Sequence, residues 1–257
     1  MTDYEIITVA THKYGLYEKL INNDFRVNIT TLGMGMKWTG FRMKYELIYN
    51  YIKNMNDNKI IIFLDGFDSK INKNPQIAID YFIKNNYKIL FSKQNNHCLF
   101  NSNKITNLIL NKIFLNKKNS LKNNCIPNTG LYMGYVKYLK AVLFELLLLP
   151  CNDDQVLLSR NLTRFDYINI DENEELFQNL NNTNDIKNSV FIQYPGNFTF
   201  SRIIKRGLFE YGQFYIKVVY FIIIIFNLLV IRFDKFNLLP INTIFYYYLQ
   251  KIDKSCI

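Results

Sequence analysis

Two carboxylates that follow an apolar run are the residues whose type and spacing best suit chemistry. Residues 60–64 are five consecutive apolar side chains, and Asp65-Gly-Phe-Asp68 comes directly after them. Gly66 permits a sharp turn, so both carboxylates can gather at one point. A carboxylate pair is a hard-oxygen site that suits Mg²⁺ or Mn²⁺ carrying a phosphate. The alternative is a polar turn that closes a buried strand, because Asp and Gly are common turn residues.

A second acidic cluster, Asn152-Asp-Asp-Gln155, follows Pro150. Asp153 and Asp154 stand where a helix is predicted to begin, and Asp is a favourable residue at the start of a helix. A carboxylate in a site can instead serve as a general base. The sequence leaves both roles open.

The histidines and cysteines exclude other common metal sites. His12 and His97 show no HxD or HxxxH spacing, and the four cysteines form no CxxC. A standard zinc site or a 2-His-1-carboxylate iron site is therefore excluded. We expect free thiols in a reducing compartment. We also expect no cleavable signal peptide, because no basic region followed by an apolar one opens the chain.

The formal net charge of +10 raises the question of an anionic partner. Lysines are densest over residues 104–122, where a solvated helix and loop is the favoured interpretation. No basic stretch resembles a nucleic-acid-binding arm, so we expect no nucleic-acid partner. An anionic nucleotide or a membrane surface remains as a partner for a basic protein.

The elements that must position these residues alternate between strand and helix. Strands are predicted over residues 5–10, 25–31, 60–64, 87–92, 165–170 and 190–193, and helices over 17–22, 43–55, 75–85 and 136–149. Residues 128–134 indicate a turn beside a short apolar strand, and 171–188 indicate mostly loop. The alternation predicts an α/β fold with a mostly parallel sheet. Open α/β sheets bind ligands at the carboxyl ends of their strands, where Asp65 and Asp68 should lie.

The C-terminal part of the chain has a different character. Residues 218–231 are apolar except for Asn227, and Lys217 and Arg232 flank them. A helix needs about 20 apolar residues to cross a bilayer, so crossing requires residues 214–217 as well. Three interpretations stay open: a membrane anchor or interfacial helix over 214–231, a buried terminal helix, or a poorly ordered tail.

Six motifs stand in an order that resembles a known family. They are Ile7-Thr-Val-Ala-Thr11, Leu32-Gly-Met-Gly-Met-Lys-Trp38, Phe63-Leu-Asp-Gly-Phe-Asp68, Asn128-Thr-Gly130, Asp153-Asp-Gln155, and Asp171 with Leu176-Phe-Gln-Asn-Leu180. Together they resemble the glycosyltransferase domain of the lysyl hydroxylases (the procollagen-lysine dioxygenase family) and the related collagen galactosyltransferases. The resemblance spans roughly residues 4–197 and implies a GT-A, Rossmann-like domain, which we place over residues 1–205. The hydrophobic helical tail that we expect over residues 206–257 comes from the apolar run described above. It also implies metal-dependent transfer of glucose or galactose from a UDP-sugar to a hydroxyl of a glycan or protein, such as hydroxylysine.

The resemblance also implies roles for individual residues. Asp65 and Asp68 correspond to the family's metal-binding carboxylates, which share Mn²⁺ (or Mg²⁺) with the UDP diphosphate. The remaining site residues fall into three groups: Thr11, Trp38 and Phe67 near the nucleotide, Asn128 and Gly130 in the sugar pocket, and Asp153 and Asp154 facing the acceptor, where either could act as a general base. For Trp38, ordinary core packing is the alternative.

This sequence departs from the family at two positions of the site. Phe67 stands where the family usually has Tyr. Gln193-Tyr-Pro-Gly-Asn197 stands where the family has a His-Gly-Asn type motif whose His binds the metal. Gln193 could offer an amide oxygen to the metal instead, and Gly196 corresponds to the glycine of that motif.

The family's dioxygenase half is absent from this sequence, so we expect no lysine hydroxylation. Two alternatives to an active transferase remain. One is an inactive module that binds a nucleotide sugar, which the missing His favours. The other is a membrane-associated interaction protein, which the apolar tail and the positive charge favour.

Overall fold

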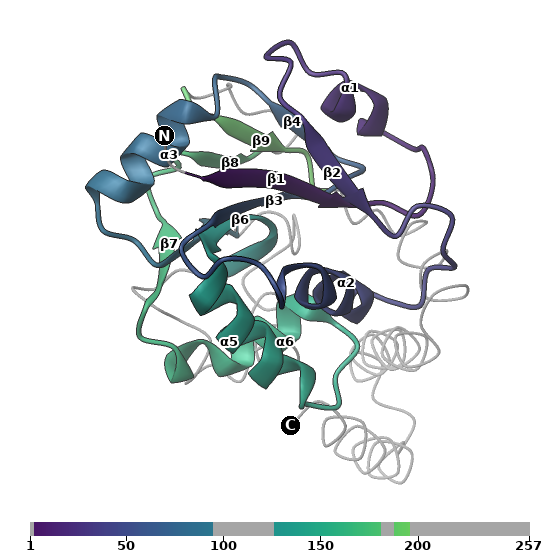
Figure 1. The fold of residues 1–257 in the computed structure, drawn as a ribbon, viewed down its shortest axis with the longest axis vertical. Coiled ribbons are helices and arrows are strands. Elements are labelled where there is room, and N and C mark those ends of the chain that lie inside the picture. The colour runs from purple at the N-terminus through teal and green to yellow at the C-terminus, as the bar shows by residue number, and fades with distance from the viewer. Residues whose placement is uncertain (1–2, 95–125, 181–187, 196–257) are drawn as a thin grey trace, which may run out of the picture. The chain divides into compact units, whose positions relative to one another are not determined.

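The computed structural model describes residues 3–94, 126–180 and 188–195 (Figure 1). The lysine-rich stretch at 104–122, Gly196, the boundary near residue 205 and the apolar tail lie outside these ranges. In the described part of the chain, no helix is both long enough and apolar enough to cross a membrane. The predictions about the tail and the domain boundary therefore stay predictions.

A mixed six-stranded sheet forms the centre of the described structure. Its strands, in spatial order, are β2 (Ile29–Leu32), β1 (Tyr4–Val9), β3 (Ile60–Leu64), β6 (Pro127–Tyr135), β5 (Ile89–Lys93) and β7 (Ile168–Asp171). Three of the five pairings are parallel, and only β6 runs antiparallel to its neighbours β3 and β5. The prediction of an α/β fold with a mostly parallel sheet is confirmed.

Helices and a small second sheet cover the two faces of this sheet. Helices α2 (Arg42–Ile52), α5 (Val136–Leu147) and α6 (Asp154–Asn161) gather on one side, and α3 (Gln76–Lys84) lies on the other (Figure 1). Side chains of β3 alternate between the faces: Ile60, Ile62 and Leu64 share a core cluster with Phe82 and Phe177. Both faces of β3 are thus covered, which explains why all five of its residues are apolar and buried.

The second sheet has the order β4 (Ser69–Ile71), β9 (Phe191–Gln193) and β8 (Phe177–Asn179). Among the described residues of 171–188, most are loop, as predicted, and the short strand β8 is an element that the sequence analysis did not predict. Strands of three residues are too short for an alternating pattern to show in the sequence. This sheet matters for the site because β4 follows the Asp65-Gly-Phe-Asp68 turn directly, and β9 pairs with β4 through Gln193 and Ser69.

Other elements differ from the prediction mainly at their ends. Strand β2 begins at Ile29 rather than at residue 25, because Arg26 has a φ of +53°, which breaks an extended strand. Strand β6 is nine residues long where a turn and a short strand were predicted. Gly134 serves close packing within this strand: a Cβ there would lie 3.0 Å from a side-chain carbon of Ile89. Helix α1 (Tyr17–Ile21) and the 3-10 helix η2 (Leu162–Arg164) complete the described structure.

Candidate active site

The turn at Asp65–Asp68 leaves the carboxyl end of β3 and packs closely on the end of β1. A Cβ at Gly66 would lie 2.7 Å from the carbonyl oxygen of Val9 and 3.0 Å from Oγ1 of Thr8. Thr8 Oγ1 also donates to the carbonyl oxygen of Leu64 at 2.7 Å. Only glycine permits this approach, so the turn is held where the parallel strands β1 and β3 end together.

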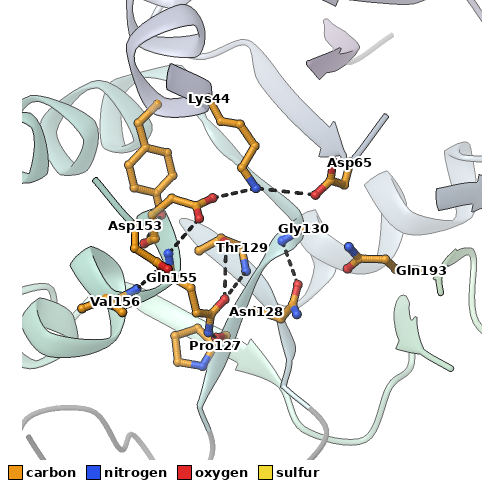
Figure 2. Close-up of polar contacts among 12 residues, drawn as sticks. Lys44, Asp65, Pro127, Asn128, Thr129, Gly130, Asp153, Gln155, Val156 and Gln193 are labelled. Carbon is orange, nitrogen blue, oxygen red and sulfur yellow. Dashed lines mark hydrogen bonds and ion pairs between the residues drawn. The ribbon is translucent and has the colours of Figure 1, made fainter. Parts of the chain in front are cut away.

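Gln193 and Gly130 approach this turn from two other strands. The backbone N–H of Asp65 donates to the carbonyl oxygen of Gly130 at 2.8 Å. Gln193 Nε2, on β9, donates to Asp68 Oδ1 at 3.1 Å. A Cβ at Gly130 would collide with the amide group of Gln193, so position 130 must be glycine for that amide to lie here. Figure 2 shows Asp65, Gly130 and Gln193 on the three segments that meet at the site.

The groups at the turn fit a hard divalent cation. Gln193 Oε1 is buried and has no hydrogen-bond partner among the residues described. A buried amide oxygen without a partner is costly unless a ligand or ion satisfies it. Within residues 3–94, 126–180 and 188–195, no group of three or more His, Cys, Asp or Glu side chains could hold a metal ion. The oxygen donors at the turn that would fit such a cation are the carboxylates of Asp65 and Asp68 and this amide oxygen, and that they bind a metal stays a prediction.

Lys44 is a site residue that the sequence analysis missed. Its Nζ lies 2.7 Å from Asp154 Oδ2 and 3.5 Å from Asp65 Oδ2, although the residue is only 4% exposed. The rings of Phe41 and Phe63 lie 5.3 Å and 5.9 Å from this ammonium group. Burial lowers the pKa of Lys44, but the carboxylates of Asp154 and Asp65 raise it more, so it stays above its ordinary value.

A signal for Lys44 was present in the sequence. Lys44, Ile48 and Ile52 recur at a spacing of four residues on α2, and all three are buried. A lysine on the apolar stripe of a helix is unusual. Burying an unpaired ammonium group lowers the stability of the fold by roughly several kcal/mol, because the charge loses its hydration. Such a lysine indicates buried carboxylates on a neighbouring element.

The two carboxylates at the start of α6 have different environments. Asp153 caps the helix, since its Oδ1 accepts the backbone N–H of Val156 at 2.9 Å, which confirms the capping interpretation. Asp154 is 3% exposed, and its Oδ1 accepts the N–H of Gln155 while its Oδ2 pairs with Lys44. Burial raises the pKa of Asp154 to about 6, although Lys44 opposes that rise. A general-base role for either residue stays a prediction.

The side chain of Gln155 links the start of α6 to the start of β6 by hydrogen bonds. Its Oε1 accepts from the backbone N–H of Thr129 at 3.0 Å and from the Thr129 hydroxyl at 3.3 Å, and its Nε2 donates to the carbonyl oxygen of Pro127 (Figure 2). Asn128 points away from Gln155 and accepts the N–H of Gly130 at 2.7 Å. These bonds fix the predicted sugar-pocket residues Asn128 and Gly130 relative to the acidic helix.

The residues predicted to contact the nucleotide lie in two aromatic groups. The ring of Phe67 packs 5.1 Å from that of His12 and 5.9 Å from that of Tyr14, which is 63% exposed. Thr11 is buried beside them, with its Oγ1 3.0 Å from His12 Nδ1. Trp38 packs edge-on against Phe41 with centroids 5.6 Å apart.

Trp38 is only partly buried, which does not match the alternative of ordinary core packing. It joins the site indirectly, because Phe41, the ring it packs against, lies beside Lys44. His12 and Tyr14 were not among the predicted site residues. The signal for them was their place in the loop directly after β1.

Asp171 belongs to the structural framework rather than to this site. Its carboxylate accepts the backbone N–H groups of Glu175, Leu176 and Phe177 at 3.0, 2.7 and 2.8 Å, and so closes the turn that leads into β8. Asp171 also lines a cavity of about 250 Å³ together with Tyr81, Tyr87 and Glu175. None of the predicted donor- or acceptor-site residues lines that cavity.

Comparisons with known proteins give one assignment. Among solved structures, the chain is similar to a glycosyltransferase involved in the glycosylation of the major capsid of PBCV-1, at 12% identity over 78% of this chain and 96% of the other, with a TM-score of 0.49. It is also similar to A197 from STIV, at 10% identity over 54% of this chain and 68% of the other, with a TM-score of 0.34. No curated protein matches the chain. A model of the family described as "PLOD GT domain" matches residues 1–197. Because that match covers more than half of the sequence, the chain belongs to the family of PLOD glycosyltransferase domains.

Proposed function

We propose that this chain has a GT-A fold and transfers a hexose, glucose or galactose, from a UDP-sugar to a hydroxyl group with the help of Mn²⁺ or Mg²⁺. One observation carries the proposal: Asp65, Asp68 and the unpartnered amide oxygen of Gln193 converge at the carboxyl end of β3. That edge is where open α/β sheets bind nucleotides. In the transfer, the bond between the sugar C1 and the diphosphate breaks, and a bond from C1 to the acceptor oxygen forms.

The donor diphosphate and the cation belong at the Asp65–Asp68 turn. A divalent cation there offsets the negative charge that develops on the departing diphosphate. Asp65 and Asp68 are the carboxylates that would hold this cation, and Asp65 also pairs through its Oδ2 with Lys44 at 3.5 Å. Gln193 is a neutral ligand, whereas the family has a His at the corresponding position, so we expect weaker metal affinity than a histidine would give.

The exposed and partly buried aromatic rings near the turn suit a nucleotide base. Phe67, Tyr14 and His12 form one group beside Thr11, and Trp38 lies on the loop after β2. Stacking of a base on an aromatic ring typically contributes about 1–3 kcal/mol. Phe67 offers its face without a hydroxyl group, so recognition of the uracil edge falls to other groups in this chain.

The acceptor hydroxyl belongs at the start of α6. Asp154 is buried, with both carboxylate oxygens engaged by Lys44 and Gln155, whereas Asp153 is partly exposed. Of the two, Asp153 is therefore the one that we assign to the acceptor, to take its proton or to orient it. Asp154, the next residue, helps to hold Asp153 in place through its contacts with Lys44 and Gln155.

A second candidate function is binding of a nucleotide sugar without transfer. The observation that favours it is Gln193, whose amide donates to Asp68 at 3.1 Å and stands where the family has a metal-binding His. If the cation is held too weakly, the donor can bind without being activated.

One assay separates the two candidates. The full chain is incubated with UDP-glucose, UDP-galactose and other UDP-hexoses in Mn²⁺, and UDP release is measured with and without EDTA. We expect release with at least one hexose, and loss of that release in EDTA. Binding of a UDP-hexose without release would favour the second candidate, and neither binding nor release would contradict both.

A further inference from the structure

The first turns of α2 dock on the segment that leads into α6. Arg42 donates from its guanidinium group to the carbonyl oxygens of Leu147 and Leu149, and its backbone N–H donates to Asn152 at 3.0 Å. The Tyr45 hydroxyl donates to the backbone carbonyl oxygen of Asp154 at 3.2 Å. Helix α2 therefore fixes the backbone of the segment that carries Asp153 and Asp154.

Lys44 lies between Arg42 and Tyr45 and adds a second kind of link. Its ammonium group reaches Asp154 at the start of α6 and Asp65 at the end of β3, as Figure 2 shows for the Asp65 side. Carboxylates and aromatic rings enclose it, and it is almost inaccessible to solvent. A substrate group has little access to an ammonium group enclosed in this way, so Lys44 does not fit a residue that binds substrate directly.

We propose that Lys44 is a positioning residue: by pairing with Asp65 and Asp154 together, it sets the metal-binding turn and the acidic helix at the separation that transfer requires. The inference rests on the proposed function, in which Asp65 serves the donor and the start of α6 serves the acceptor. Its physical basis is that one small cation holds two carboxylates that would otherwise repel each other. Reactions of this kind are sensitive to misplacement of about 1 Å, which can cost about 100-fold in rate.

The geometry separates this role from direct metal or substrate binding. Lys44 contacts Asp65 through Oδ2 at 3.5 Å and Asp154 through Oδ2 at 2.7 Å, so the tighter contact is with the helix that faces the acceptor. Loss of Lys44 should therefore disturb the placement of α6 more than the affinity for the cation. In kinetic terms, kcat should fall while KM for the donor changes little.

The test is a double-mutant cycle on the full chain. Lys44→Met and Asp154→Asn are compared singly and together for kcat, for KM with the active UDP-hexose, for Mn²⁺ affinity by electron paramagnetic resonance, and for melting temperature. The double variant matters because Lys44→Met alone leaves Asp154 buried and unpaired and could fail to fold. Lys53→Met, at the exposed end of the same helix, is the matched control, since its Nζ contacts only Asn50 among the described side chains.

We expect Lys44→Met to lower kcat by about 100-fold and to leave the KM for the donor and the Mn²⁺ dissociation constant within about threefold. In the Asp154→Asn background, Lys44→Met should cost little more, because its partner is already changed. Lys53→Met should match the wild type. Losses in kcat that multiply independently, or a rise in KM or in the Mn²⁺ dissociation constant with kcat unchanged, would overturn the proposal.

The melting temperatures distinguish a failure of the positioning role of Lys44 from a failure of the proposed transferase function. If the wild-type chain releases no UDP from any hexose, the proposed function fails. The ion pair is still tested by the cycle: losses in melting temperature that do not add support the coupling of Lys44 to Asp154, and losses that add overturn it.

Discussion

The amide group of Gln193 occupies the space that a side chain at position 130 would fill. A Cβ on Gly130 would collide with this amide, and the same amide donates to Asp68 Oδ1 at 3.1 Å. The glycine on β6 thus allows a residue on β9 to reach the turn after β3. The metal-site hypothesis depends on this relationship, because Gln193 supplies the one oxygen of the donor set that is not a carboxylate.

Gly130→Ala should therefore damage both stability and metal binding. The added methyl group displaces Gln193 from a packed position, and overpacking of this kind typically costs about 1–3 kcal/mol. We expect a lower melting temperature and weaker Mn²⁺ binding by electron paramagnetic resonance. The control is Gly130→Ala combined with Gln193→Ser, which removes the clash. That pair should regain stability without regaining metal affinity, and a double variant as unstable as Gly130→Ala alone would contradict the contact.

Asp65→Asn should abolish Mn²⁺-dependent UDP release while the domain stays folded. The change removes one charge from the cation site and keeps the shape of the side chain. Asp80→Asn is the matched control, because Asp80 lies on α3 with an exposed carboxylate that accepts from its helix neighbour Gln76 at 2.8 Å. The measurements are UDP release and circular dichroism. An Asp65→Asn protein that is folded and fully active would place the cation elsewhere.

Trp38 should report nucleotide binding through its fluorescence. It is the only Trp of the chain, so any change in the emission spectrum belongs to it. Trp38 packs against Phe41 and is only partly buried, so a base stacked nearby should alter its surroundings. We expect a spectral change on addition of UDP with Mn²⁺, and none with Mn²⁺ removed by EDTA. An unchanged spectrum when calorimetry shows saturation would exclude contact between Trp38 and the nucleotide.

Asp171→Ala should destabilise the fold without a direct effect on the site. The carboxylate is buried and accepts three backbone N–H groups of the turn before β8. Bonds to a charged acceptor contribute about 1.5–3 kcal/mol each, and they share one acceptor here, so a total loss of about 3 kcal/mol is expected. Denaturant unfolding measures it. Asp171→Asn, which keeps an oxygen acceptor, should lose less, and equal losses would show that the hydrogen bonds are not the cause.

The sequence predicted those parts of the structure that depend on local patterns. The apolar run of β3 and the Asp and Gly residues after it placed Asp65 at a strand end, and the two adjacent aspartates located the start of α6. Such local patterns do not predict contacts between residues that are distant in the sequence. Gln193 and Asp68 are 125 residues apart, and Lys44 pairs with Asp154 only because α2 and α6 lie on the same face of the sheet. The resemblance to a family suggested Gln193 as a ligand. The position of Lys44 on an apolar helix stripe indicated a buried carboxylate partner, but it did not indicate which carboxylate that would be.

The pair of Lys44 and Asp154 predicts how stability depends on pH. Burial raises the pKa of Asp154 to about 6 in the folded protein, above its ordinary value of 3.8. A carboxyl group whose pKa is raised by folding binds its proton more tightly in the folded state. Its contribution to stability is therefore lost as pH rises from about 4 to about 6. Lys44 limits this loss, because its positive charge favours the ionised form of Asp154.

Without Lys44, the pKa of Asp154 should rise further, and the loss of stability should extend to higher pH. We therefore expect Lys44→Met to lower the melting temperature more at pH 8 than at pH 5, where a protonated Asp154 no longer needs a partner. Asp154→Asn combined with Lys44→Met removes the titrating group, so its melting temperature relative to the wild type should vary much less between these pH values. Thermal unfolding of the three proteins in matched ionic strength measures the effect. A Lys44→Met variant that loses the same number of degrees at both pH values would show that Lys44 does not stabilise an ionised Asp154.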